Sequence, residues 1–201
     1  MESPTIWKII ISVLLLSSFG CIAKTCDPPK NLIKSGDLIY RYENSLVSDL
    51  VLKYQGEKSY SHVGIAVTHG PQIKVIHSLL NLDEGIDGVT SQDYCGYIKD
   101  ALRIEVKRLK KINGGIQNRL LNSIETNQNK KFNRTFDFNS QDSVYCTQYV
   151  WMVYKDALHA DPFKLKPNSN LIITVRDLLA SNAFYTVLKS PANTSSNKKA
   201  H

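Results

Sequence analysis

The sequence predicts one α+β domain in which a small antiparallel sheet packs against helices. Its length of 201 residues suits a single domain, and its 42% of hydrophobic residues is ordinary for a globular protein. The predicted elements follow the order strand, helix, a run of strands and then helices, which is typical of folds whose helices gather outside an antiparallel sheet. The expected organisation is a linker at 24–34, a domain over 35–190 and a disordered tail at 191–201.

The first half of the domain carries the clearest strand signals. β-Branched residues on both sides of the turn at 69–71 predict a hairpin over 62–78. A turn at Gly36-Asp37 precedes the first strand, and the apolar residues that follow it recur at helical spacing. Strands are therefore expected at 38–42, 63–68 and 73–77, a helix at 45–54, and a polar loop at 81–97.

Helical patterns dominate the second half of the domain. Apolar and charged residues alternate in LRIEVKRL, which predicts a half-buried strand, and Gly114-Gly115 opens an amphipathic helix. Thr174 is a good N-cap for a short helix, whereas 129–143 is polar and irregular. The expected elements are a strand at 102–109, helices at 116–127, 149–158 and 174–181, and a final strand at 184–188.

The N-terminus has the plan of a secretory signal peptide, with one lysine, a short apolar run and then small residues. The run IIISVLLL is too short for a stable membrane span, which argues against an uncleaved anchor. Two endings stay open: cleavage after Ala23, with 1–23 as the signal, or a lipoprotein signal at 1–20 that leaves Cys21 lipidated. Either ending predicts an exported protein of the bacterial periplasm or cell envelope, secreted or lipid-anchored.

The net charge limits the classes of expected partner, and the cysteine content indicates the expected compartment. The net charge of +7 favours anionic partners, but the lysines are scattered and no recognition helix or zinc finger is visible, so nucleic acid is not an expected partner. Four cysteines are present, and an oxidising compartment favours their pairing. If Cys21 is removed or lipidated, a disulfide between Cys26 and Cys95 leaves Cys146 free, although the sequence alone does not establish this connectivity.

Cys146 lies where a polar, turn-rich run meets an apolar stretch. Asp142 and Ser143 are good helix caps, so the cysteine is expected in the first turn of a helix. Free backbone N–H groups and the positive end of the helix dipole favour a thiolate there, and the same N–H groups can bind an oxyanion. This position suits a nucleophile, but it also suits a small buried core residue.

Two histidines are placed to serve such a nucleophile. His62 begins one strand of the predicted hairpin and His77 ends the other, so both are expected at its open end. His62 would take the thiol proton, and His77 would orient the ring of His62. The alternatives are a cross-strand surface pair, two histidines whose hydrogen bonds are satisfied within the sheet, and a zinc site shared with Cys146. The spacings match no standard zinc motif, so neither a metal nor another cofactor is expected.

Four stretches of the chain resemble the YiiX-like permuted papain-like amidases, which are related to NlpC-type and lecithin:retinol acyltransferase-type proteins. These stretches are SGDLIYR (35–41), YSHVGIAV (60–67), KVIHS (74–78) and FDFNSQDSVYCTQYVWMVY (136–154). The resemblance implies a papain-like core in circularly permuted order, in which the histidine strand precedes the nucleophile helix.

The resemblance also implies roles for individual residues. By position, Cys146 matches the nucleophile, His62 the base and His77 the third polar residue. Many members have glutamate at the third position and the acyltransferase branch often has histidine, which leaves the acyl acceptor open. Gln148 stands where the family often has glutamate and receives no catalytic role, whereas Tyr145 is expected to line the substrate site.

Together these expectations describe an exported thiol hydrolase that cleaves amide or ester bonds through a cysteinyl thioester. Its expected substrates are peptides, cell-wall fragments or lipids, and a lipidated Cys21 would hold the protein at the membrane. Two alternatives stay open: a lipid acyltransferase of the same superfamily, and a catalytically inactive envelope-binding protein that keeps the fold.

Overall fold

The structure is a computed structural model that describes residues 26–44, 46–56, 59–165 and 172–190. The predicted signal peptide, the lipidation site at Cys21 and the C-terminal tail lie outside these residues. Among the described residues, no helix is long and apolar enough to span a membrane.

One antiparallel sheet organises the fold, and its strands run in the order β4-β3-β2-β1-β5-β8. A second, much smaller sheet is a parallel pair of two-residue strands, β6 and β7. The strands are β1 (Leu38–Glu43), β2 (His62–His69), β3 (Gln72–Asn81), β4 (Ile86–Asp93), β5 (Ala101–Leu109), β6 (Lys131–Phe132), β7 (Ser143–Val144) and β8 (Phe184–Ser190).

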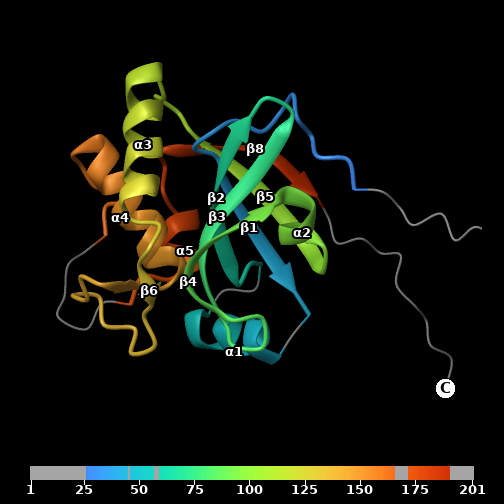
Figure 1. Ribbon diagram of the computed structural model, residues 1–201, viewed down its shortest axis with the longest axis vertical. Coiled ribbons are helices and arrows are strands. Elements are labelled where there is room, and N and C mark those ends of the chain that lie inside the picture. Colours follow the sequence, from blue (N-terminus) through green and yellow to red (C-terminus); the bar gives the residue numbers. More distant parts are fainter. Residues whose placement is uncertain (1–25, 45, 57–58, 166–171, 191–201) are drawn as a thin grey trace, which may run out of the picture.

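Helices cover both faces of the main sheet. Figure 1 shows α3 and α4 on one side, the short helix α2 on the other, and α1 at the end of the sheet where β1 finishes. The helices are α1 (Leu46–Gln55), α2 (Tyr94–Ile98), α3 (Gly114–Thr126), α4 (Cys146–Leu158) and α5 (Val175–Leu179). Thr174 caps α5 as predicted, because its hydroxyl accepts a hydrogen bond from the Asp177 N–H. The predicted α+β class is confirmed.

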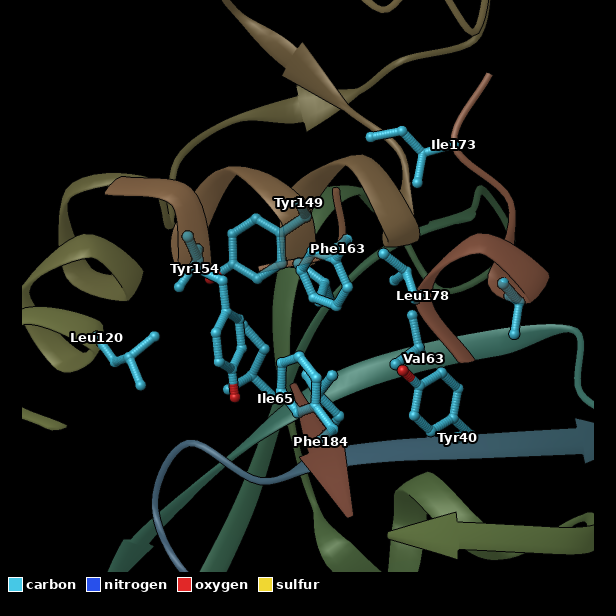
Figure 2. Close-up of a cluster of buried hydrophobic side chains, with 14 of the residues drawn as sticks. Tyr40, Val63, Ile65, Leu120, Tyr149, Tyr154, Phe163, Ile173, Leu178 and Phe184 are labelled. Atoms are coloured by element: carbon cyan, nitrogen blue, oxygen red, sulfur yellow. The ribbon is translucent and has the colours of Figure 1, made fainter. Parts of the chain in front are cut away.

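The larger core lies between the sheet and α4. Alternation along the strands points Tyr40, Val63 and Ile65 to this face, where they meet Tyr149 and Tyr154 of α4 (Figure 2). All five side chains are fully buried. Burying an apolar side chain of this size contributes roughly 1.5–3 kcal/mol, so this face holds the helix that begins at Cys146 firmly against the sheet.

The opposite face of the sheet packs against α2. Tyr97 is fully buried there, and its hydroxyl donates a hydrogen bond to the Ile39 carbonyl of β1. A disulfide joins Cys95 of α2 to Cys26, which ties the segment before the domain to this helix. The linker and the disulfide therefore hold Tyr97 over the sheet.

Asp37 fixes the turn that precedes β1. Its carboxylate accepts two hydrogen bonds from the Arg108 guanidinium, both at 2.7 Å, and a third from the Lys34 N–H. The bond from the Lys34 N–H belongs to the turn that the sequence predicted at Gly36-Asp37. The ion pair between the buried Asp37 carboxylate and the half-buried Arg108 side chain joins the turn to β5.

The prediction of a polar loop at 81–97 is wrong. Residues 86–93 form β4, which pairs with β3 over eight residue pairs, and α2 follows directly. β4 is an edge strand whose one fully buried residue is Gly88, so it lacks the apolar alternation that marks a half-buried strand. Gly88 has a positive φ and its backbone lies against Lys130, so this strand depends on long-range contacts.

Candidate active site

Strands β2 and β3 stop pairing at the open end of their hairpin, and α4 begins near this open end. The pairing of the two strands runs from His69–Gln72 to Ile65–Ile76, while β3 continues along β4 as far as Asn81. The Ser78 hydroxyl, beyond the last β2–β3 pair, donates a hydrogen bond to the Val144 carbonyl at 2.6 Å. This contact fixes the segment that leads into α4 beside the open hairpin.

Cys146 is the first residue of α4, as the sequence predicted. The predicted caps are wrong, because the N-cap is Tyr145 and not Asp142 or Ser143. Ser143 belongs to β7, whose pairing with β6 holds it in an extended conformation. The Gln148 side chain instead accepts a hydrogen bond from the Tyr145 N–H at 3.3 Å and so stabilises the helix start.

Gln148 also fastens the irregular loop before the nucleophile. Its amide group accepts a hydrogen bond from Asn133 and donates one to the Phe138 carbonyl, both at 3.1 Å. The side chain is buried, so its contacts are with the protein scaffold. This arrangement explains a polar residue at this position without a catalytic role.

Tyr145 is buried beside the cysteine. Its ring packs on Phe136, with 5.2 Å between ring centroids, and its hydroxyl accepts a hydrogen bond from the Ile173 N–H at 2.8 Å. These contacts hold the chain at the helix start. A contact between Tyr145 and substrate remains a prediction.

His62 and His77 meet at the open end of the hairpin. Nε2 of His62 lies 2.9 Å from Nδ1 of His77, at hydrogen-bond distance. Gly64 leaves room for this contact, because a Cβ at that position would lie 3.1 Å from Cβ of His77 and 2.5 Å from Cγ1 of Val75. The absence of a side chain at Gly64 thus allows the His77 ring to lean toward His62.

Three residues that the sequence analysis missed surround this pair. Gln92 of β4 places its amide oxygen 3.1 Å from Nε2 of His77. Tyr97 of α2 packs its ring against both histidines, and the Arg41 guanidinium lies 4.7 Å from the centroid of that ring. Gln92 and Tyr97 fall in the stretch wrongly predicted as a loop, so their approach to His77 had no visible signal.

Cys146 lies next to this group. Backbone N–H groups of Val63 and Thr147 act on the sulfur and lower its pKa, and the sulfur in turn contributes to the raised pKa of Tyr97. The thiol therefore lies beside the residue that follows His62. Cys146 as a residue is half-buried, but its sulfur is surrounded by protein atoms. The remaining histidines lie elsewhere: His69 is at the turn end of β2 and His159 caps the far end of α4, whereas His201 lies outside the described residues.

Burial decides the charge state of the site. Loss of water around the sulfur raises the pKa of Cys146 to about 11, more than the nearby N–H groups and Arg41 lower it. Burial, with added repulsion from Arg41, lowers the pKa of His77 to about 3 and that of His62 well below its ordinary value. The resting site is therefore a neutral thiol beside a neutral imidazole, in contrast to the thiolate that the helix position suggested.

The same side chains do not fit a shared metal ion. The facing nitrogens of His62 and His77 are 2.9 Å apart and engaged with each other, so they cannot both donate lone pairs to one ion. Within the described part of the chain, no group of three or more histidine, cysteine, aspartate or glutamate side chains is arranged to hold a metal. A neutral thiol, an imidazole and backbone N–H groups around the sulfur instead suit nucleophilic attack on a carbonyl.

Comparisons with known proteins identify the family and the fold of the chain. The model of a family described as permuted papain-like amidase enzymes, YaeF/YiiX, C92 family, matches residues 32–187. Among solved structures, the chain is similar to the metalloprotein yiiX from Escherichia coli O157:H7, with 18% sequence identity, a TM-score of 0.65, and coverage of 80% of this chain and 99% of that chain. No curated protein matches the chain significantly. The predicted permuted papain-like fold is confirmed, and the chain belongs to the permuted papain-like amidase family, a group of papain-like hydrolases.

Proposed function

We propose that the protein hydrolyses amide or ester bonds with Cys146 as nucleophile and His62 as general base. The observation that carries this proposal is the 2.9 Å contact between Nε2 of His62 and Nδ1 of His77. It occupies one nitrogen of the His62 ring and leaves Nδ1 for the thiol. An orienting partner behind the base is what nucleophilic catalysis by a weakly acidic thiol needs.

The proposed reaction has two halves. The sulfur of Cys146 attacks the carbonyl carbon while its proton passes to Nδ1 of His62, and backbone N–H groups at the start of α4 hold the oxyanion. Collapse of the tetrahedral intermediate expels the amine or alcohol, which takes the proton from His62 and leaves a thioester. Water then attacks the thioester, His62 takes its proton, and the acid departs as the thiol is restored.

The proposed setting is the bacterial periplasm or cell envelope. A disulfide between Cys26 and Cys95 suits an oxidising compartment, which agrees with the signal peptide predicted at the N-terminus. Peptides, cell-wall fragments and lipid-linked acyl groups are the substrate classes found in that setting. Lipidation at Cys21 would place the catalytic domain at a membrane surface.

A lipid acyltransferase is the second candidate, and the histidine at position 77 favours it. In the acyltransferase branch of the superfamily the third polar residue is often histidine, and His77 contacts His62 directly. Both candidates form the same thioester and differ only in the acceptor. Product analysis with a phospholipid donor separates them, since transfer to an amine or a second lipid would exceed hydrolysis only in the acyltransferase.

The test is to trap the acyl-enzyme. The wild-type protein is mixed with activated esters and amides, quenched in acid and analysed by intact and peptide mass spectrometry. We expect one acyl group on Cys146, none in Cys146→Ser at the same site, and slow acylation in His62→Ala. His69→Ala is the matched control, because His69 is an exposed histidine at the other end of the same strand.

Two outcomes would overturn the proposal. If Cys146 is acylated equally fast in His62→Ala and in the wild type, His62 is not the general base. If no donor acylates Cys146, the protein is better described as an inactive binding protein. Turnover is also measured with a chelator present, because the structurally similar E. coli protein is described as a metalloprotein. We expect the chelator to leave turnover unchanged.

A further inference from the structure

We propose that Gln92 is a positioning residue that sets the tautomers of both histidines and thereby presents a free lone pair to Cys146. This inference rests on the proposed function and assigns a role to a fourth side chain of the site. β4 brings Gln92 there: the register pairs Gln92 with Val75 and Thr90 with His77, so Gln92 lies one diagonal step from His77 on the same face of the sheet.

The argument begins at the amide oxygen. The contact joins Oε1 of Gln92 to Nε2 of His77 at 3.1 Å, and an amide oxygen can only accept a hydrogen bond. Nε2 of His77 must therefore carry the ring proton. Because the neutral ring holds one N–H, Nδ1 of His77 is then an acceptor.

In the second step, the tautomer of His77 determines the tautomer of His62. An acceptor at Nδ1 of His77, 2.9 Å away, requires that Nε2 of His62 carries its proton. Nδ1 of His62 is then left with a free lone pair, which is the atom that must take the thiol proton. If the Gln92 amide were turned round, each hydrogen bond would reverse and Nδ1 of His62 would carry a proton and could not act as a base.

The charges around the two histidines favour neutral rings, so their orientation depends on uncharged hydrogen bonds. The Arg41 guanidinium acts on both histidines and disfavours their protonation, and it is itself balanced by Glu43 at 3.4 Å. Tyr97 and Cys146, the other titratable groups against the histidines, are protonated at neutral pH. Gln92 orients the rings without adding charge, whereas a glutamate at this position would place an anion against His77 and raise the pKa of the histidine pair, so that the pair takes up one proton at a higher pH.

The first experiment reads the tautomers directly. Long-range ¹H–¹⁵N NMR spectra of the ¹⁵N-histidine-labelled wild-type protein distinguish protonated from unprotonated ring nitrogens. We expect the proton on Nε2 in both His62 and His77, with assignments from His62→Gln and His77→Gln. A proton on Nδ1 of His77 would overturn the proposal. This readout does not depend on turnover, so a protein with the expected tautomers and no acylation would refute only the proposed function.

The second experiment compares Gln92→Leu, Gln92→Glu and the matched control Gln72→Leu, which makes the same change at an exposed position on β3. We expect Gln92→Leu to lower kcat about ten- to hundredfold with little change in KM, in the range typical for residues that orient a ligating or catalytic group. Gln92→Glu should keep most of the activity at neutral pH and move the acid limb of the kcat/KM profile upward by a pH unit or more.

Two results would contradict this role. Gln92→Leu with the kcat of Gln72→Leu would show that the ring orientation does not depend on the amide. An acid limb in Gln92→Glu that stays where the wild type has it would show that the side chain does not act on the histidines. If Gln92→Leu fails to fold, the wild-type tautomers and the Gln92→Glu profile decide the question.

Discussion

The thiol of Cys146 should stay protonated up to strongly alkaline pH. Its pKa of about 11 means that only about one molecule in 10⁴ carries a thiolate at pH 7, against about 3% for an ordinary cysteine of pKa 8.5. That ratio alone makes Cys146 roughly 300 times less reactive toward a disulfide reagent. The more basic thiolate regains about tenfold in nucleophilicity, which leaves a net deficit of roughly 30-fold.

The assay follows the exchange of Cys146 with a small pyridyl disulfide reagent between pH 6 and 10, with N-acetylcysteine as the free-thiol reference. Because Cys146 is the acid and its pKa is raised, the rate should rise about tenfold for each pH unit across this range and show no plateau. The difference between the wild type and Cys146→Ser removes any signal from other cysteines. Thiolate absorbance at 240 nm gives an independent titration curve.

A plateau in the exchange rate below pH 8 would refute this reasoning. It would mean that Cys146 and His62 form a thiolate–imidazolium ion pair, so that the helix N-terminus and the histidine outweigh burial. The acid limb of kcat/KM provides a second check on the same balance. Since the pKa of His62 is lowered well below 6.5, the active neutral base should persist into acid, and activity should survive at pH 5.5.

Three further substitutions test the scaffold of the site. Gly64→Ala sets a methyl group 3.1 Å from Cβ of His77 and should cost about 1–3 kcal/mol of stability together with much of kcat, so unchanged urea unfolding and turnover would contradict the crowding argument. Replacing both Cys26 and Cys95 by serine removes a disulfide that links residues 69 positions apart. The chain-entropy estimate is a loss of about 4 kcal/mol in the free energy of unfolding, measured by urea unfolding without reductant. A loss under about 1 kcal/mol would show that the disulfide constrains the unfolded chain little. Asp37→Asn removes the charge partner of the half-buried Arg108 guanidinium and should lower the free energy of unfolding by about 1–3 kcal/mol, whereas an unchanged midpoint would mean that water replaces the carboxylate.

The sequence predicted the part of the site that local pattern controls. A strong hairpin signal placed His62 and His77 at one open end, and the step from polar to apolar residues placed Cys146 at a helix start. The structure brings the two histidines into contact and begins the helix at Cys146 itself. Both inferences needed only the periods of strands and helices and the position of a turn.

The remaining parts of the site depend on pairings between distant segments. Gln92 reaches His77 because β4 adds to the edge of the sheet, yet IDGVTSQD has no apolar alternation that would reveal a strand. Ser143 was predicted as a helix cap because serine favours N-cap positions. In the structure, a two-residue pairing between β7 and β6 holds Ser143 in an extended conformation instead. Local propensity gave way to tertiary contacts in both cases.

A neutral resting site changes what the fold must supply. A thiolate–imidazolium pair has its nucleophile already formed, whereas a neutral thiol must lose its proton as the sulfur attacks, so the ring of His62 has to be aimed correctly at that moment. Three contacts orient the two rings. Tyr97 packs against both of them, and Gly64 leaves space for the His77 side chain. Gln92 contacts Nε2 of His77, the nitrogen that faces away from His62. Because these contacts are uncharged, added salt should affect turnover little, while small displacements of the rings should affect it strongly.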